Sequence, residues 1–188
     1  MYVMAVIITS FFVSQYYCKG GIKKHLASLG FPSVINEPVD CYICQREKKL
    51  PMFDAILTNP PFSADHISRA VHFAMKSSKP FAMLLPNNVF LRDWFKPYLN
   101  SFIFLSPHER YSFEVADSSK SQTKGELHSP LATMWYISGF EKNDLSDIVI
   151  SWEMSEQSTK ATLAQTPDEL PRRIRKLLPF TKVVIKYF

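Results

Sequence analysis

The sequence predicts an α/β protein whose sheet is mostly parallel, and three observations support this fold class. Apolar runs such as Ala55 to Thr58 and Phe81 to Leu85 do not alternate with polar residues, which is typical of strands covered on both faces. A segment with helical spacing lies between these two runs, so the order is strand, helix, strand. The 188 residues are 46% hydrophobic and 14% aromatic, which suits one globular domain with a sizeable core.

The chain begins with a strongly apolar stretch, Met1 to Val13. This stretch is too short to span a bilayer securely and lacks the basic leader of a secretory signal. Met4 to Ile8 suits a buried first strand. A substitute amino terminus in residues 1–15 fits equally well, and a membrane anchor is a third, weaker alternative.

A turn, a helix and a second strand are expected next. Gly20 and Gly21 form a turn that leads into a helix from Ile22, and Gly30 closes this helix. Ser33 to Asn36 is then a short strand.

The third predicted strand, Ala55 to Thr58, ends in Asn59, Pro60, Pro61 and Phe62. Two prolines remove two backbone donors and fix two φ angles, so Asn59 and Phe62 are presented from a stiff, extended loop. That loop lies at the carboxyl edge of the sheet, where open α/β sheets bind ligands.

Such a loop suits chemistry on an aromatic amine, whose lone pair is delocalised into its ring. The amide oxygen of Asn59 and the carbonyl of Pro60 are each able to accept one N–H and aim the lone pair at an incoming methyl group. Each well-placed group of this kind is worth on the order of 3 kcal/mol. Phe62 offers a stacking face for a flipped or single-stranded base, worth roughly 1–3 kcal/mol.

Asn59-Pro60-Pro61-Phe62, after Ile56-Leu57-Thr58, resembles motif IV of the class I S-adenosylmethionine-dependent amino-methyltransferases, especially the N6-adenine group. An ordinary turn is the alternative explanation of the motif. The resemblance covers roughly Tyr16 to Gly139. It implies a Rossmann-like three-layer methyltransferase fold, with a mostly parallel sheet and an antiparallel last strand, and S-adenosyl-L-methionine as the cofactor.

The resemblance also assigns residues to the cofactor. An acidic residue at the tip of the second strand, here Glu37, bonds ribose hydroxyls in Rossmann-like folds. The complete assigned set is Tyr17, Cys18, Gly20, Glu37 and Asp40. Relatives carry Asp-Pro directly before the aromatic pair, whereas this chain has Ser14-Gln15, so the acidic anchor of the first motif is missing.

Further elements are expected after the motif. We predict a helix over Asp65 to Lys76 capped by Ser63, and the strand Phe81 to Leu85 is stopped by Pro86. The later elements are a helix from Arg92 to Lys96 and strands at Phe102 to Leu105 and Leu131 to Ile137. The polar segment between these last two strands, Arg110 to Ser129, is either a solvated loop or a nucleic-acid contact.

The charge balance favours an anionic partner. The formal net charge is +5 and the pI is about 9.1, which suits DNA or RNA. Residues 151–165 are expected to be a polar linker before the basic run Arg172 to Lys176, which either contacts phosphate, serves as a nuclear address, or is the solvated face of a terminal helix.

Three cysteines argue against a disulfide framework and for a reducing compartment, either nucleus or cytoplasm. Cys41 and Cys44 have CxxC spacing, but no second pair completes a zinc site, so we expect no metal. No membrane association is expected either.

The sequence thus predicts an N-methyltransferase, residues 16–150, that acts on adenine N6 of DNA or RNA, with Asn59, Pro60, Pro61 and Phe62 as the catalytic loop. Two alternatives stay open. One is a catalytically silent nucleic-acid-binding module or partner subunit that has lost its first motif. The other is a protein glutamine N-methyltransferase, since this group shares the motif.

Overall fold

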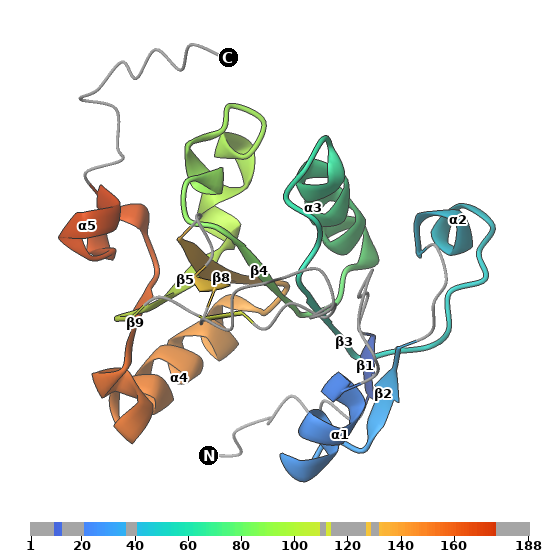
Figure 1. The fold of residues 1–188 in the computed structure, drawn as a ribbon, viewed down its shortest axis with the longest axis horizontal. Coiled ribbons are helices and arrows are strands. Elements are labelled where there is room, and N and C mark those ends of the chain that lie inside the picture. Colours follow the sequence, from blue (N-terminus) through green and yellow to red (C-terminus); the bar gives the residue numbers. More distant parts are fainter. Residues whose placement is uncertain are drawn as a thin grey trace.

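A seven-stranded sheet organises the molecule (Figure 1). The computed structural model describes residues 10–12, 21–36, 41–109, 112–113, 127–128 and 132–175. From one edge to the other, the sheet contains β2 (Ser33–Ile35), β1 (Ser10–Phe12), β3 (Ala55–Thr58), β4 (Phe81–Pro86), β8 (Thr133–Ser138), β5 (Ile103–Pro107) and β9 (Ala161–Ala164). Two short strands, β6 (Ser112–Phe113) and β7 (Leu127–His128), pair separately.

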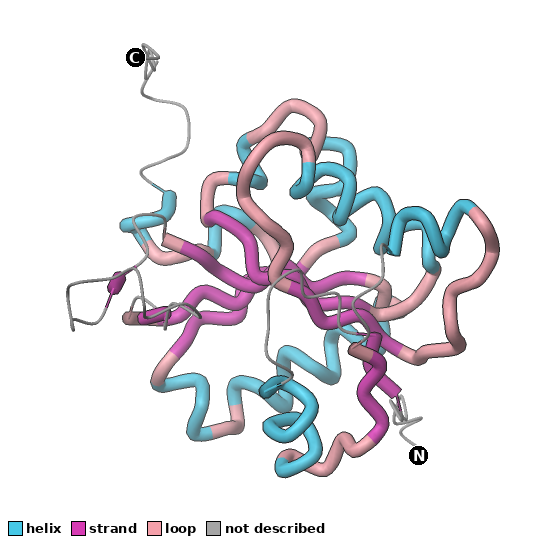
Figure 2. Tube along the Cα trace, turned by 45° about the vertical axis from the view of Figure 1, so that its right-hand side comes forward, coloured by secondary structure: helices cyan, strands magenta, loops and turns pink. Residues whose placement is uncertain are grey.

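Helices cover both faces of the sheet, giving the three layers that were expected (Figures 1 and 2). One face carries α2, α3 and α5, and the other carries α1 and α4. The α-helices are α1 (Gly21–Ser28), α2 (Cys41–Arg46), α3 (His66–Ser77), α4 (Lys142–Glu153) and α5 (Arg172–Arg175). The 3₁₀ helices are η1 (Val89–Leu91), η2 (Lys96–Ser101), η3 (Glu156–Thr159) and η4 (Pro167–Glu169).

The prediction of an α/β fold is confirmed, but the sheet is mixed rather than mostly parallel. Pairings β1–β2, β1–β3 and β3–β4 are parallel, whereas β4–β8, β5–β8 and β5–β9 are antiparallel. Because β8 inserts between β4 and β5, it makes two antiparallel pairings instead of one. The strand β9, which the sequence did not predict, adds the third.

Several elements lie where the sequence predicted them. The strands β2, β3, β4 and β8 match the expected runs to within two residues at either end. Gly30 ends the first helix with a φ of 92°, a left-handed conformation that glycine adopts without a steric penalty. Helix α3 is present, but Asp65 rather than Ser63 is its N-cap residue, and no side chain caps it. The expected first strand, Met4 to Ile8, lies outside the described residues, and β1 is at Ser10–Phe12.

The predicted linker over residues 151–165 is wrong in its second half. Ala161–Ala164 pairs with β5 and forms the edge strand β9. This segment has only four residues with mostly small side chains, so it does not stand out in the sequence as an apolar run. It forms a strand because it pairs with the edge of β5. Leu170 and Ile174 then pack into the core, at 0% and 3% exposure. The described chain from residue 151 to residue 175 therefore continues the same globular unit.

The segment predicted as a helix from Arg92 to Lys96 is also different. It is a bend between η1 and η2, and the backbone N–H of Phe95 donates to Arg92 O at 2.9 Å. Pro97 stands at the start of η2 and restricts the chain to a short 3₁₀ turn. The bend buries Phe95 completely.

Aromatic side chains dominate the core under this bend. The ring of Phe95 lies 4.8 Å from that of Phe102 and 5.5 Å from that of Tyr136, between ring centroids. The ring centroid of Phe104 lies 5.4 Å from that of Tyr136. These rings lie where β4, β8 and β5 pair, so the described aromatic core belongs to this half of the sheet.

Candidate functional site

The strand order creates a crevice position beside β1. After β1 the chain moves outward to β2 and then returns to β3 on the other side of β1, with both pairings parallel. In open α/β sheets, ligands bind at the carboxyl edge where the strand order reverses in this way. The loop Asn59 to Phe62 follows β3 directly, so it lies at this edge.

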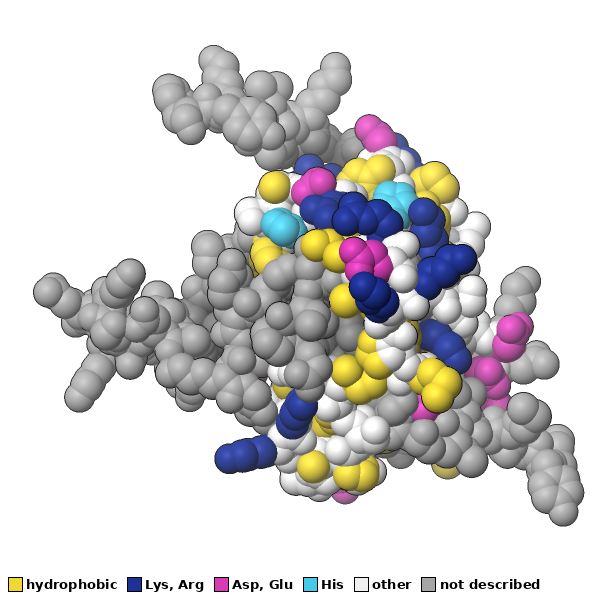
Figure 3. Space-filling model, turned by 90° about the vertical axis from the view of Figure 1, so that its right-hand side faces the viewer, with side chains coloured by type: hydrophobic (Ala, Val, Ile, Leu, Met, Phe, Trp, Pro, Cys, Tyr) yellow, Lys and Arg dark blue, Asp and Glu magenta, His cyan; other side chains and the backbone are white. Residues whose placement is uncertain are grey.

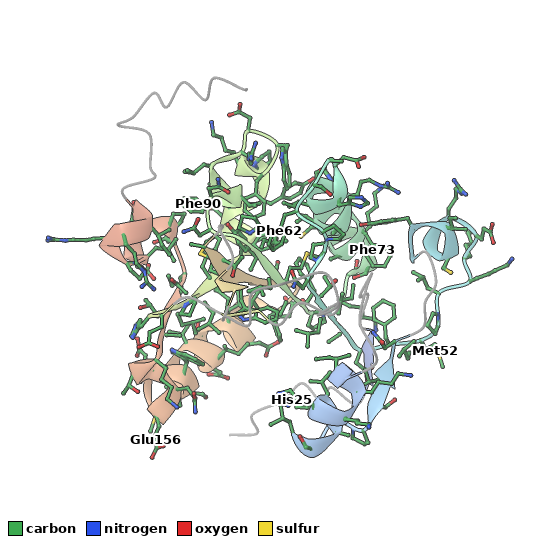
Figure 4. All side chains as sticks on the ribbon, viewed as in Figure 1. His25, Met52, Phe62, Phe73, Phe90 and Glu156 are labelled. Carbon is green, nitrogen blue, oxygen red and sulfur yellow. The ribbon has the colours of Figure 1, made fainter. Side chains whose placement is uncertain are left out.

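The residues of the loop differ in exposure. Asn59 is exposed and makes no hydrogen bond to any described side chain or backbone group, while Pro60 is buried and Phe62 is half-buried. Figure 4 shows Phe62 above the central strands, between Phe73 of α3 and Phe90 in that view. Buried proline therefore anchors the loop and leaves the Asn59 amide available to a ligand.

Backbone strain follows the loop immediately. Ala64 has a φ of 51°, a left-handed conformation that costs a residue with a Cβ about 1–2 kcal/mol. This turn reverses the chain into α3, whose buried side chains, Ala70, Val71, Phe73 and Ala74, fix the helix on the sheet. Packing of α3 thus compensates the strained turn and holds the site loop in place.

A second polar loop lies beside the first one. Strands β3 and β4 are parallel, with Thr58 opposite Met83, so Asn87 and Asn88 after β4 reach the same edge. Both asparagines are half-buried, and the backbone N–H of Asn87 donates to Ala132 O at 2.9 Å. The site edge therefore has two adjacent loops with side-chain amides.

The side chain of Tyr136 on β8 forms hydrogen bonds to the backbone on both sides of this second loop. Its hydroxyl donates to Pro86 O at 3.0 Å and accepts the N–H of Phe90 at 3.3 Å. Burial raises the pKa of the Tyr136 hydroxyl far above its usual value, because the phenolate would lose its hydration. The group is therefore a neutral structural tether at neutral pH. The sequence predicts only that Tyr136 belongs to a strand, because its hydrogen-bond partner Phe90 is 46 residues away in the chain.

The residues that the resemblance assigned to the cofactor are outside the described part of the chain. This holds for Tyr17, Cys18, Gly20, Glu37 and Asp40. In the chain, the first group lies between β1 and α1, and the second group lies between β2 and α2 or directly at the start of α2.

No metal centre is formed by the described side chains, because no three of their His, Cys, Asp or Glu residues come close enough to share an ion. Cys44 is a free thiol on α2. Within the described ranges, no helix is long and apolar enough to cross a membrane.

Fold and site together define an α/β protein whose sheet has a switch point at β1, an edge where open α/β sheets commonly bind ligands. No protein-family model matches the chain, and no curated protein sequence is similar to it. Among solved structures, the chain is similar to a SAM-dependent O-methyltransferase from Thermotoga maritima, with a TM-score of 0.35 and 10% identity. The alignment covers 73% of this chain and 62% of that enzyme, so the chain spans less than two thirds of its length. A similarity of this size does not identify a family.

Proposed function

We propose that this protein is an S-adenosylmethionine-dependent methyltransferase that acts on an amino nitrogen, with adenine N6 of DNA or RNA as its substrate. The observation that carries the proposal is the position of Asn59 to Phe62, at the carboxyl end of β3 and beside the switch point. Its sequence is that of an amine-orienting loop, and its exposed amide meets the edge where a ligand would lie.

Each residue of the loop has a separate role in this proposal. Asn59 Oδ1 and Pro60 O accept the two N–H groups of the amine and orient its lone pair, so no strong base is needed. Phe62 stacks on the base, and burial of Pro60 keeps the acceptors at a fixed spacing. The proton that the amine loses passes to solvent, because Asn59 is exposed.

S-adenosyl-L-methionine supplies, when bound, a methyl group on a positively charged sulfur that leaves as a neutral thioether. Glu37 and Asp40 would hold its ribose and adenine, and the turn Tyr17 to Gly20 its methionine end. The support for these assignments is their order in the chain, directly after β1 and directly after β2.

Replacing Asn59 by Ala tests the role of the loop. We expect the rate of N6-methyladenine formation in a single-stranded oligonucleotide, measured by nucleoside mass spectrometry, to fall by about 10²–10³-fold. Cofactor binding, measured by calorimetry, should be unchanged. Asn100→Ala is the matched control, because Asn100 is also exposed but lies on η2. Equal rates for Asn59→Ala and the wild type would sink the assignment.

A second candidate function is a silent nucleic-acid-binding module or partner subunit. The observation that favours it is Ser14-Gln15 in the place of the acidic anchor. Calorimetric titration of the wild type and Glu37→Ala with the cofactor separates the two. Binding that Glu37→Ala weakens supports the enzyme, whereas a folded chain that releases no heat supports the silent module. Methylation of a glutamine peptide instead of the oligonucleotide would redirect the proposal to protein substrates.

A further inference from the structure

One face of the molecule concentrates its positive charge. The segments 41–50, 65–77 and 92–98 hold seven Lys and Arg against three Asp and Glu, a net of +4 out of +5 for the whole chain. All ten side chains are exposed. The remainder of the sequence holds 15 Lys and Arg against 14 Asp and Glu, so its summed charge is close to zero, although residues 171–188 carry six of these cations and no acidic residue.

Contacts between aromatic and basic side chains join these three segments into a continuous surface. The guanidinium of Arg69 on α3 lies 4.3 Å from the ring centroid of Tyr42 on α2. On the other flank, the His72 ring lies 6.1 Å from that of Trp94 and 5.7 Å from that of Tyr98. Helix α3 therefore lies between α2 and the bend before η2, in contact with both.

The outer side of α3 provides the centre of this surface. Arg69, His72 and Lys76 are spaced by three and four residues, so they form one stripe along the helix, and all are exposed. Figure 3 shows Lys and Arg side chains gathered on the upper part of this side of the molecule, with hydrophobic side chains between them. We call this surface the basic face, and its members are Arg46, Lys48, Lys49, Arg69, His72, Lys76, Arg92 and Lys96, with the rings of Tyr42, Trp94 and Tyr98.

Few acidic groups neutralise the basic face. Asp93 pairs with Lys96 at 2.6 Å, Glu47 with Lys49 at 2.9 Å and Asp65 with Arg69 at 4.0 Å. Lys76 and Arg92 have no ion pair with any described acidic residue. Exposed pairs of this kind bind weakly and exchange readily for a phosphate.

The basic face also begins at the site. Helix α3 starts four residues after Phe62, and Arg92 follows η1 and the loop of Asn87 and Asn88 at the same edge. By contrast, Arg173 of the basic carboxyl-terminal run is exposed but already engaged, because its guanidinium donates to the carbonyls of Pro107 and His108. This arginine is therefore less available to a phosphate than Lys76 or Arg92.

We propose that the basic face binds the phosphate backbone of a single-stranded nucleic acid and leads one of its bases to Phe62. Cations interleaved with half-buried aromatic rings are the usual surface for single strands, because phosphates meet the cations and bases stack on rings. The proposal deepens the proposed function and rests on it only for the destination of the base, since binding itself needs no cofactor.

The test is the affinity of a fluorescein-labelled single-stranded oligonucleotide of about 12 nucleotides, without cofactor, over a series of salt concentrations. The variant is Lys76→Ala/Arg92→Ala/Lys96→Ala, and the control Lys24→Ala/Lys160→Ala/Arg172→Ala removes the same charge from exposed positions elsewhere. For single strands each phosphate contact contributes about 0.7 to the slope of log K against log salt. The variant lacks three cations, so the magnitude of its slope should be smaller by about 2. That loss corresponds to roughly a hundredfold weaker binding at about 0.1 M salt.

Two results would overturn the inference once both variants are shown to be folded by circular dichroism. One is binding by the variant that equals that of the wild type, and the other is an equal loss in the control. Failure of the proposed function gives a different pattern: the variant binds more weakly than the control, but the wild type transfers no methyl group. Stronger competition by a duplex than by the single strand would also contradict the proposal.

Discussion

The two halves of the sheet differ in construction. The parallel half, β2, β1 and β3, has strands of three or four residues, whereas β4 and β8 in the antiparallel half have six each. Among the large side chains whose burial the structure describes, Ile56 is the fully buried one in β2 and β3, and β4, β8 and β5 contribute several. The site edge lies beside this short-stranded half, and the aromatic core lies beside the other. The candidate site therefore lies beside the half with the shorter strands, and binding loops are commonly found in the less stable parts of a fold.

The largest expected effect tests where the stability resides. Phe95→Ala should lower the free energy of unfolding by about 3–5 kcal/mol, because the ring is fully buried among other rings and leaves a cavity. Ile35→Ala in β2 removes a half-buried side chain and should cost only about 1–2 kcal/mol. Urea unfolding of both variants measures the difference. Equal costs would contradict the division into a stable and a less stable half.

A glycine from each half provides a second comparison. Gly139 follows β8 with a φ of 86°, and a Cβ there would clash with the carbonyl of Lys79. Gly139→Ala should therefore cost about 2–4 kcal/mol, from the strained φ together with the clash. Gly30 has a φ of 92°, but no atom lies within 4 Å of a Cβ. Gly30→Ala should cost only about 1 kcal/mol. Thermal unfolding of both variants measures the two stability losses, and that of Gly139→Ala should be the larger.

A third comparison concerns the tether between the antiparallel half and the site edge. Tyr136→Phe leaves Pro86 O and the N–H of Phe90 unpaired, which should cost about 1–3 kcal/mol at neutral pH.

Because burial raises the pKa of Tyr136 in the folded state, its contribution is complete below pH about 10 and is lost as the pH rises further. The stability of the wild type should thus fall more steeply above pH 10 than that of Tyr136→Phe. Tyr98→Phe, at a half-buried position, is the control and should keep the steep fall. If the free energy of unfolding falls equally with pH in the wild type and in Tyr136→Phe, the hydroxyl is not desolvated as described.

The sequence predicts the elements whose signals are local. Ala55–Thr58 and Phe81–Pro86 are apolar runs stopped by proline, and the periodicity of α3 needs no partner to be visible. The edge strand β9 and helix α2 lack such signals. Ala161–Ala164 forms a strand because β5 lies beside it. Cys41–Arg46 has only six residues, which are too few for a helical period to be visible in the sequence.

The same distinction holds for the site. The prolines alone predicted an extended loop at Asn59 to Phe62. In contrast, the neighbouring loop at Asn87 and its tether to Tyr136 depend on strand order, which joins residues about 50 positions apart. The basic face has the same origin, because it assembles cations from three separate segments. Composition revealed the excess of charge, but only the packing of α3 between α2 and the bend before η2 showed where it gathers.

The insertion of β8 between β4 and β5 also has a consequence for biosynthesis. Strands β4 and β5 are separated by only 16 residues of chain, yet they never pair with each other, since β8 lies between them. Until the ribosome has released residues 133–138, β4 and β5 each keep an open edge. The nascent chain must therefore hold these apolar strands apart until β8 emerges, and this interval is when newly made molecules are most exposed to chaperones and to aggregation.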